Sequence, residues 1–207
     1  MRLIGMLDSP YVRRVAISLD ILGVPFTHES VSVFSTFDQF KEINPVVKAP
    51  TLVCDDGDII MDSSLILQFV EATATDGRNL WSSDPLQLQH QFCAVSLALA
   101  ACEKSAQIIY EQNLRPKEVQ YAPWIGRVTG QLLAAYAALE REVQQRPDVF
   151  SSSLSQAAIT AAISWQFTQA MLPAVVPGAN YPGLADLSEW LETSAPFLKY
   201  PPDGPGV

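Results

Sequence analysis

Apolar and polar residues follow two different patterns in the two parts of this sequence. Up to about residue 73, short apolar runs alternate with segments that repeat with the period of a helix. The apolar runs at 3–7 and 26–33 predict strands, and the 3.6-residue period between them predicts a helix over about 10–22. This first part therefore begins as strand, helix and strand.

A hairpin and a third helix complete the first pattern. Asp55-Asp56-Gly57-Asp58 separates the apolar segments 51–54 and 59–61, which is a hairpin signal. Asp62-Ser63-Ser64 then opens a further helical period. The predicted order over the first part is β-α-β-α-β-β-α, so we expect a mixed sheet with helices packed on it.

The pattern changes after the polar segment that ends near Arg78, because no strand-like run follows it. Helical periodicities cover 85–114, 123–145, 155–172 and about 184–193, and a segment rich in proline and glycine follows. We predict an all-α second domain. The expected limits are a first domain at 1–76, a linker at 77–84 and a helical domain at 85–207.

Composition excludes several classes of function. A net charge of −9 and a pI near 4.6 argue against nucleic-acid binding, which needs clustered Lys and Arg. Three cysteines without a CxxC pair and two histidines predict no metal site. No continuous apolar run approaches the roughly eighteen residues that span a bilayer, and no signal-peptide pattern opens the chain. We expect a cytoplasmic protein with no membrane partner.

Three short segments carry candidate chemistry. Ser9-Pro10 begins the first helix, where serine can cap the helix and a bound anion is stabilised. Ala49-Pro50 stands at a strand start, a common place for proline. Asp62-Ser63 consists of two good capping residues. Each segment alone is explained by local structure, and the three are expected at one end of the same sheet.

Together these segments resemble a known family. Ser9-Pro10-Tyr11-Val12-Arg13, the stretch Asn44-Pro45 to Pro50 and the Asp62-Ser63 pair resemble, at this spacing, the soluble glutathione transferases. The resemblance covers essentially the whole chain and is closest to bacterial members with serine before the first-helix proline. It implies a thioredoxin-like domain followed by an all-helical domain, glutathione as co-substrate, and a homodimer.

The resemblance also implies how the thiol end of glutathione is held. Ser9 would donate a hydrogen bond to the thiolate, whose free pKa is near 8.5. Ala49-Pro50 matches the family's cis-proline site, where the backbone of Ala49 would pair with the cysteinyl backbone of glutathione. Glycine usually stands where this chain has Val47, and a larger aliphatic residue where it has Ala49.

At the other end of glutathione, the resemblance implies three contacts. Asp62 would face the γ-glutamyl ammonium, and Ser63 with the helix start would hold the adjacent carboxylate. Lys48 would reach the glycyl carboxylate, or would simply be solvated.

The electrophile would be small and apolar. Its pocket is expected near Tyr11, Lys104, Ser105 and Ile108.

The resulting prediction is a glutathione transferase of detoxification type that transfers the thiolate to an apolar electrophile. Two alternatives stay open: a glutathione-dependent peroxidase or isomerase, and a binding or scaffold protein without catalysis. Three phenylalanines between 34 and 40 suggest a surface for the homodimer, because a small domain has little room to bury them. Arg13 and Arg14 are expected on a solvated or subunit-facing side of the first helix.

Overall fold

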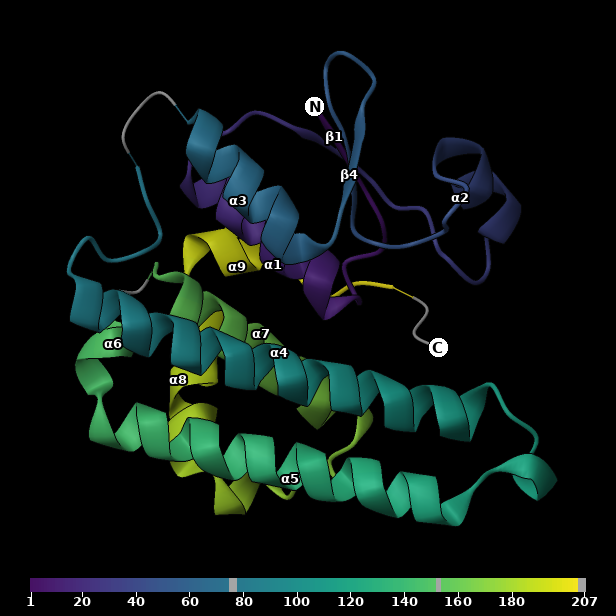
Figure 1. Cartoon of the computed structure of the whole chain (residues 1–207), viewed down its shortest axis with the longest axis vertical. Coiled ribbons are helices and arrows are strands. Elements are labelled where there is room, and N and C mark those ends of the chain that lie inside the picture. Colours follow the sequence, from purple (N-terminus) through teal and green to yellow (C-terminus); the bar gives the residue numbers. More distant parts are fainter. Residues whose placement is uncertain (75–77, 152–153, 205–207) are drawn as a thin grey trace. The chain divides into compact units, whose positions relative to one another are not determined.

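The computed structural model describes residues 1–74, 78–151 and 154–204, and divides into two compact units (Figure 1). The first unit contains residues 1–80 and the segment that begins at Ser194; the second contains residues 81–193. The domain limits derived from the sequence stay a prediction. The structure adds that the segment after Ser194 packs with the first unit.

The first unit is built on a four-stranded mixed sheet. Its strand order is β2-β1-β3-β4, with β1 and β2 parallel and the other neighbours antiparallel. This confirms the predicted mixed sheet and hairpin. The strands are short: β1 Arg2–Ile4, β2 Thr27–Glu29, β3 Thr51–Val53 and β4 Ile59–Met61.

The described residues of the first unit form the helices α1 Pro10–Ile21, α2 Phe37–Ile43, α3 Ser63–Thr73 and α9 Ala195–Lys199. The apolar face of α1 is buried as the period predicted. The phenylalanines of α2 and the residues before it divide, because Phe40 is fully buried whereas Phe34 and Phe37 are 40% and 47% exposed. The expectation that all three lie at the surface is therefore wrong for Phe40, which packs in the core beside Ile4.

The expectation that Arg13 and Arg14 lie on a solvated or subunit-facing side of the first helix is also wrong, since only 1% and 2% of their surfaces are exposed. Arg13 donates from Nε to the carbonyl of Tyr200 at 2.7 Å and from Nη2 to that of Phe197 at 3.5 Å. Its guanidinium also lies over the Phe197 ring, 5.3 Å from the centroid. Backbone carbonyls brought by a distant segment make burial of this charge possible.

The segment that carries those carbonyls is ordered against α1. Helix α9 lies beside α1 (Figure 1), where Lys199 forms an ion pair with Asp20. The ring of Tyr200 stacks on Phe26 at 5.8 Å. The sequence predicted no helix here, because proline and glycine dominate the residues that follow.

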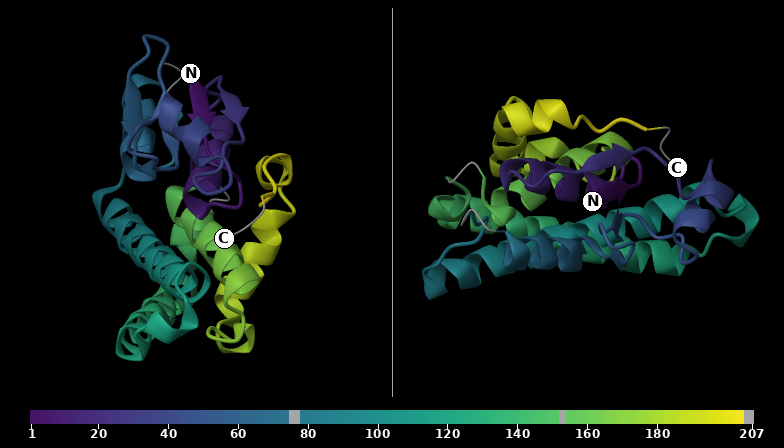
Figure 2. Two further views of the ribbon diagram at one scale, coloured as in Figure 1. Left: turned by 90° about the vertical axis from the view of Figure 1, so that its right-hand side faces the viewer. Right: turned by 90° about the horizontal axis from the view of Figure 1, so that it is seen from above.

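The second unit is helical, as predicted. Helices α4 and α5 are long and run in opposite directions beside each other (Figure 2). The helices are α4 Pro85–Asn113, α5 Ala122–Gln145, α6 Pro147–Ser151, α7 Gln156–Met171 and α8 Pro182–Glu192, with 3-10 turns at Lys117–Val119 (η1) and Gly178–Asn180 (η2).

Side chains cap the starts of α4, α7 and α8 in this unit. Asp84 accepts from the amide of Gln87 at 2.9 Å, and Ser155 accepts from that of Ala158 at 3.2 Å. At the start of α8 the cap comes from another helix, since Glu140 of α5 accepts from the amides of Gly183 and Leu184 at 2.8 and 2.9 Å. Amides that the first turns of these three helices leave without an intrahelical partner are therefore hydrogen-bonded by side chains.

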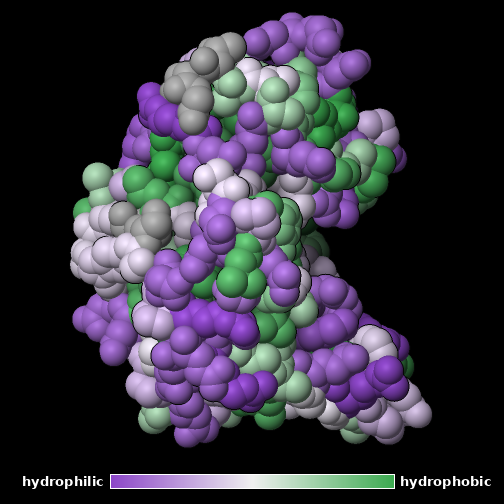
Figure 3. All heavy atoms as spheres, turned by 60° about the vertical axis from the view of Figure 1, so that its left-hand side comes forward, coloured by the Kyte–Doolittle hydropathy of each residue, from purple (hydrophilic) through white to green (hydrophobic). Residues whose placement is uncertain are grey.

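Helix α4 bears on the expectation that no apolar run is long enough to span a bilayer. By length and composition it passes as a membrane span, with an 18-residue window of mean hydropathy 1.4. Within the structure 44% of that window is buried, including Ala94, Ala98 and Ala101. Core helices of soluble proteins have the same property. On the face drawn in Figure 3, hydrophobic side chains interrupt a mostly hydrophilic surface.

Candidate functional site

The strand register brings three strand ends to one end of the sheet. Ile4 of β1 pairs with Thr51 of β3, and Thr51 pairs with Met61 of β4. The carboxyl ends of β1 and β4 therefore lie beside the amino end of β3. The candidate segments adjoin these strand ends, which is the arrangement the sequence suggested.

Ser9 follows β1 and is the N-cap residue of α1. Its backbone carbonyl accepts from the amide of Arg13 at 3.0 Å, which closes the first helical turn. Within the described residues its hydroxyl makes no capping hydrogen bond, in contrast to the Ser155 hydroxyl at the start of α7. The Ser9 side chain is half-buried and its hydroxyl stands at the positive end of a helix dipole. A purely capping role for this hydroxyl is not supported.

The segment before β3 lies against the end of β1. A Cβ placed on Gly5 would be 3.1 Å from the Cβ of Ala49, so the two backbones approach closely. The Ala49–Pro50 peptide bond is cis, as the resemblance implied. The Thr51 side chain fixes the backbone between Asn44 and Pro50. Its hydroxyl donates to the carbonyl of Lys48 at 2.7 Å and accepts from the side-chain amide of Asn44 at 2.8 Å.

Val47 adopts a backbone conformation that glycine would adopt more easily. Its φ is 50°, in the left-handed region that β-branched residues rarely enter. Its side chain is half-buried and packs against the core formed around Ile4 and Phe40. The loop before Ala49 therefore reaches a glycine-type geometry with a valine, at a cost in backbone strain.

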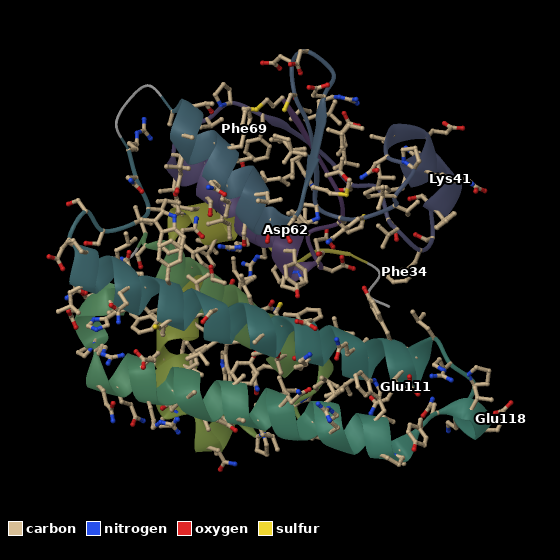
Figure 4. The ribbon with its side chains drawn as sticks, in the orientation of Figure 1. Phe34, Lys41, Asp62, Phe69, Glu111 and Glu118 are labelled. Carbon is tan, nitrogen blue, oxygen red and sulfur yellow. The ribbon has the colours of Figure 1, made fainter. Side chains whose placement is uncertain are left out.

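Asp62 begins α3 where the hairpin ends (Figure 4). Its Oδ1 accepts from the amides of Ser64 and Leu65 at 2.9 and 3.3 Å, so it caps the helix. Both bonds end on the same oxygen, which leaves Oδ2 outside the cap. Asp62 also has a positive φ of 76°, which Asp and Asn tolerate better than most residues.

The Ser63 hydroxyl is hydrogen-bonded to the buried guanidinium of Arg14. Nη1 of Arg14 donates to the hydroxyl oxygens of Ser63 and Ser64, each at 3.1 Å. Because the Ser63 hydroxyl accepts from Arg14, its own proton remains available to donate. Sequence reasoning missed Arg14, because nothing in the local pattern shows that α1 and α3 pack together.

The remaining predicted residues are less concentrated. Lys48 is exposed, and Tyr11 is half-buried on α1. Lys104 belongs to the second unit, where it pairs with Glu103 at 3.0 Å. The structure thus brings Ser9, Ala49-Pro50 and Asp62-Ser63 to one end of the first unit, and the place of Lys104 in a substrate pocket stays a prediction.

Ser105 and Ile108 are buried in the second unit, at 0% and 1% exposure. The Ser105 hydroxyl shares a hydrogen bond of 2.8 Å with Thr168, which also accepts from Tyr136 at 2.6 Å. Burial raises the pKa of Tyr136 well above its usual value. This buried network favours a packing role for Ser105, and its place in a substrate pocket stays a prediction, as does that of Ile108.

A cavity of about 240 Å³ lies at the other end of α1 and α3. It is lined by Met1, the turn from Leu22 to Pro25, Val70, Thr73 and Ala74. Ser9 and Asp62 stand at the opposite termini of the same helices. This cavity is therefore separate from the candidate site.

Comparison with known proteins agrees with this geometry. Residues 3–78 match the family described as "Glutathione S-transferase, N-terminal domain". A probable maleylacetoacetate isomerase of Caenorhabditis elegans is 36% identical over 90 residues, 42% of this chain and 41% of that protein. Glutathione S-transferase U4 of Arabidopsis thaliana is 25% identical over 91 residues, 44% of this chain and 38% of that protein. The matches thus span about two fifths of these curated relatives.

Solved structures extend the likeness over the whole chain. A glutathione S-transferase from Methylobacterium radiotolerans JCM 2831, in complex with glutathione sulfonate, has a TM-score of 0.89 at 26% identity, covering 100% of this chain and 96% of that one. A glutathione transferase family member from Pseudomonas fluorescens Pf-5 with bound glutathione has a TM-score of 0.84 at 24% identity, covering 98% and 99%.

The fold and the site define a thioredoxin-like unit joined to a helical unit. Residues 3–78 belong to the family of glutathione S-transferase N-terminal domains, and the whole chain shares the fold of solved glutathione transferases.

Proposed function

We propose that this protein is a glutathione transferase whose Ser9 hydroxyl stabilises the glutathione thiolate for attack on an apolar electrophile. The observation that carries the proposal is the lack, in the described part of the chain, of a capping hydrogen bond from the Ser9 side chain. Its hydroxyl stands at a helix N-terminus without a capping bond inside the described residues, at the same sheet end as Asp62 and Ser63. A cap alone would use that hydroxyl on the helix.

In the proposed reaction Ser9 only donates a hydrogen bond and forms no covalent bond. Bound glutathione loses its thiol proton to bulk water, and the Ser9 hydroxyl donates a charge-assisted hydrogen bond to the sulfur. The positive end of α1 adds to the same effect. The thiolate then forms a C–S bond to the electrophilic carbon, and the leaving group departs with its electron pair.

The γ-glutamyl end is proposed to lie on α3. Oδ2 of Asp62, outside the cap, accepts from the ammonium. The Ser63 hydroxyl donates to the carboxylate, supported by the positive charge of Arg14 immediately behind it. In the middle of the ligand, the backbone of Ala49 pairs with the cysteinyl residue, and Lys48 is the candidate for the glycyl carboxylate.

Titration calorimetry with glutathione, followed by turnover of 1-chloro-2,4-dinitrobenzene, tests the proposal. Binding with turnover is the expected result. Binding without turnover of any electrophile in a panel supports a non-catalytic glutathione-binding protein instead. Absence of glutathione binding refutes the site as a whole.

A glutathione-dependent isomerase is the second candidate. It is favoured by the 36% identity to the Caenorhabditis elegans protein named as a probable maleylacetoacetate isomerase. The same thiolate would add to a C=C bond, allow rotation and leave again, so that glutathione is not consumed. Glutathione-dependent isomerisation of maleylacetoacetate that exceeds transfer to 1-chloro-2,4-dinitrobenzene would favour this candidate.

The assembly and compartment are proposals of the same kind. We propose a two-fold symmetric homodimer in the cytoplasm. Two exposed phenylalanines, Phe34 and Phe37, support a surface for it on the first unit.

A further inference from the structure

The segment after α9 passes beside the turn that carries Ser9. The amide of Asp8 donates to the carbonyl of Asp203 at 3.1 Å. Gly204 is equally close, because a Cβ placed on it would lie 2.3 Å from Oδ2 of Asp8 and 2.8 Å from its Cβ. Two residues separated by most of the chain therefore meet next to the candidate thiol position.

This contact is supported on both sides. Arg13, one turn into α1, holds the carbonyl of Tyr200 at 2.7 Å, three residues before Asp203. Ser9 precedes the same helix and is covalently adjacent to Asp8. The two ends of the contact are thus fixed to one helix.

Two carboxylates belong to this contact, those of Asp8 and Asp203. Since Cα atoms of neighbouring residues are about 3.8 Å apart, the Asp8 carboxylate lies within roughly 10 Å of the Ser9 hydroxyl. That distance is comparable to the Debye length of about 8 Å at physiological salt. The backbone of Asp203 meets that of Asp8 at 3.1 Å. An anion beside Ser9 would therefore experience the negative charge of Asp8, and Asp203 adds a second carboxylate to the same contact.

We propose that Asp8 and Asp203 form an acidic edge of the thiol site that selects against anionic electrophiles and favours neutral or cationic ones. The proposal rests on the proposed transfer function. It also separates the two candidate functions, because maleylacetoacetate is a dicarboxylate and the acidic edge would oppose its approach.

Two chloro-dinitroarenes of like mechanism test the acidic edge. 1-Chloro-2,4-dinitrobenzene is neutral and 4-chloro-3,5-dinitrobenzoate carries a carboxylate. In both, the thiolate forms the C–S bond and chloride leaves with the electron pair. The quantity of interest is the kcat/KM of the anionic compound divided by that of the neutral one, normalised to the uncatalysed rates with glutathione.

Asp203→Asn removes one charge and leaves the backbone bond to Asp8 in place. We expect it to raise the ratio by roughly two- to tenfold, and less at high salt. Gly204→Ala should also raise it, because the added methyl group collides with Asp8 and displaces the segment. The control is Asp56→Asn at the hairpin turn, the opposite end of the sheet, where asparagine can keep the bond to the amide of Asp58.

An Asp203→Asn ratio equal to that of the wild type, or matched by Asp56→Asn, would overturn the acidic edge. Calorimetry with the two glutathione conjugates, one carrying the carboxylate and one without it, gives a readout that does not need turnover. A wild type that turns over neither arene refutes the transfer function. In that case the acidic edge stands if Asp203→Asn selectively tightens the carboxylated conjugate and falls if it does not.

Discussion

Replacement of Asp62 by asparagine separates the two roles that we assign to this residue. The cap uses only Oδ1, and asparagine has an equivalent oxygen and is an equally good N-cap. Asparagine also tolerates the positive φ of this position. What disappears is the negative charge that would face the ammonium of glutathione.

Loss of a hydrogen bond between charged groups costs about 1.5–3 kcal/mol. The dissociation constant of glutathione should therefore rise about 10- to 150-fold, whereas the melting temperature should change little. Titration calorimetry and thermal unfolding measure the two effects separately.

The matched control is Asp84→Asn, which changes the aspartate cap of α4 in the same way in the second unit. It should leave the affinity for glutathione unchanged. Glutathione acetylated on its amino group gives a second control, because its loss of the ammonium should make its affinity insensitive to Asp62→Asn. Equal glutathione affinities of wild type and Asp62→Asn, or an equal loss in Asp84→Asn, would refute the assignment.

Three further predictions concern stability and assembly. Val47→Gly and Val47→Ala both remove the valine methyl groups that pack against the core, but only glycine relieves the left-handed backbone, so Val47→Gly should retain about 1 kcal/mol more unfolding free energy than Val47→Ala in denaturant titrations. An equal or greater loss in Val47→Gly contradicts the strain. A hydrogen bond from the Tyr121 amide, together with the interaction with Arg115, lowers the pKa of Glu111 in the folded protein. The Glu111 carboxylate therefore stabilises the fold above its unfolded pKa, and this contribution is lost as the pH falls through its folded pKa. The melting temperatures of wild type and Glu111→Gln should converge below about pH 4, and a constant difference down to about pH 3 would speak against this contribution. Phe37→Glu should weaken the proposed dimer with helical content intact, and a wild-type mass by light scattering near that of one 22.7 kDa chain would end that idea.

Local patterns predicted the order of elements and the place of the site. The hairpin signal at Asp55–Asp58 and the helix start at Asp62 depend on neighbouring residues, so they are visible in the sequence. Once the strand order is known, the convergence of Ser9, Ala49 and Asp62 follows from the register alone.

Long-range partners account for what the sequence did not show. A hydropathy pattern places arginine at the surface. Arg13 and Arg14 are nevertheless buried, because backbone carbonyls near residue 200 and side-chain hydroxyls of α3 accept hydrogen bonds from them. The contact between Asp8 and Asp203 spans nearly the whole chain, and no local signal marks it. The left-handed φ of Val47 was indicated only by the resemblance, which implied glycine at this position.

The most direct test of the central claim follows the thiol of bound glutathione in wild type and Ser9→Ala. Thiolate absorbance is recorded against pH, and melting temperatures are recorded alongside. Ser155→Ala is the matched control, because it removes a serine that does cap its helix.

Removing one charge-assisted hydrogen bond should raise the pKa of the bound thiol by about one to two units in Ser9→Ala. Ser155→Ala should lower the melting temperature and leave that pKa unchanged. An identical thiol titration in wild type and Ser9→Ala would contradict the role of Ser9 and assign the thiolate to another donor.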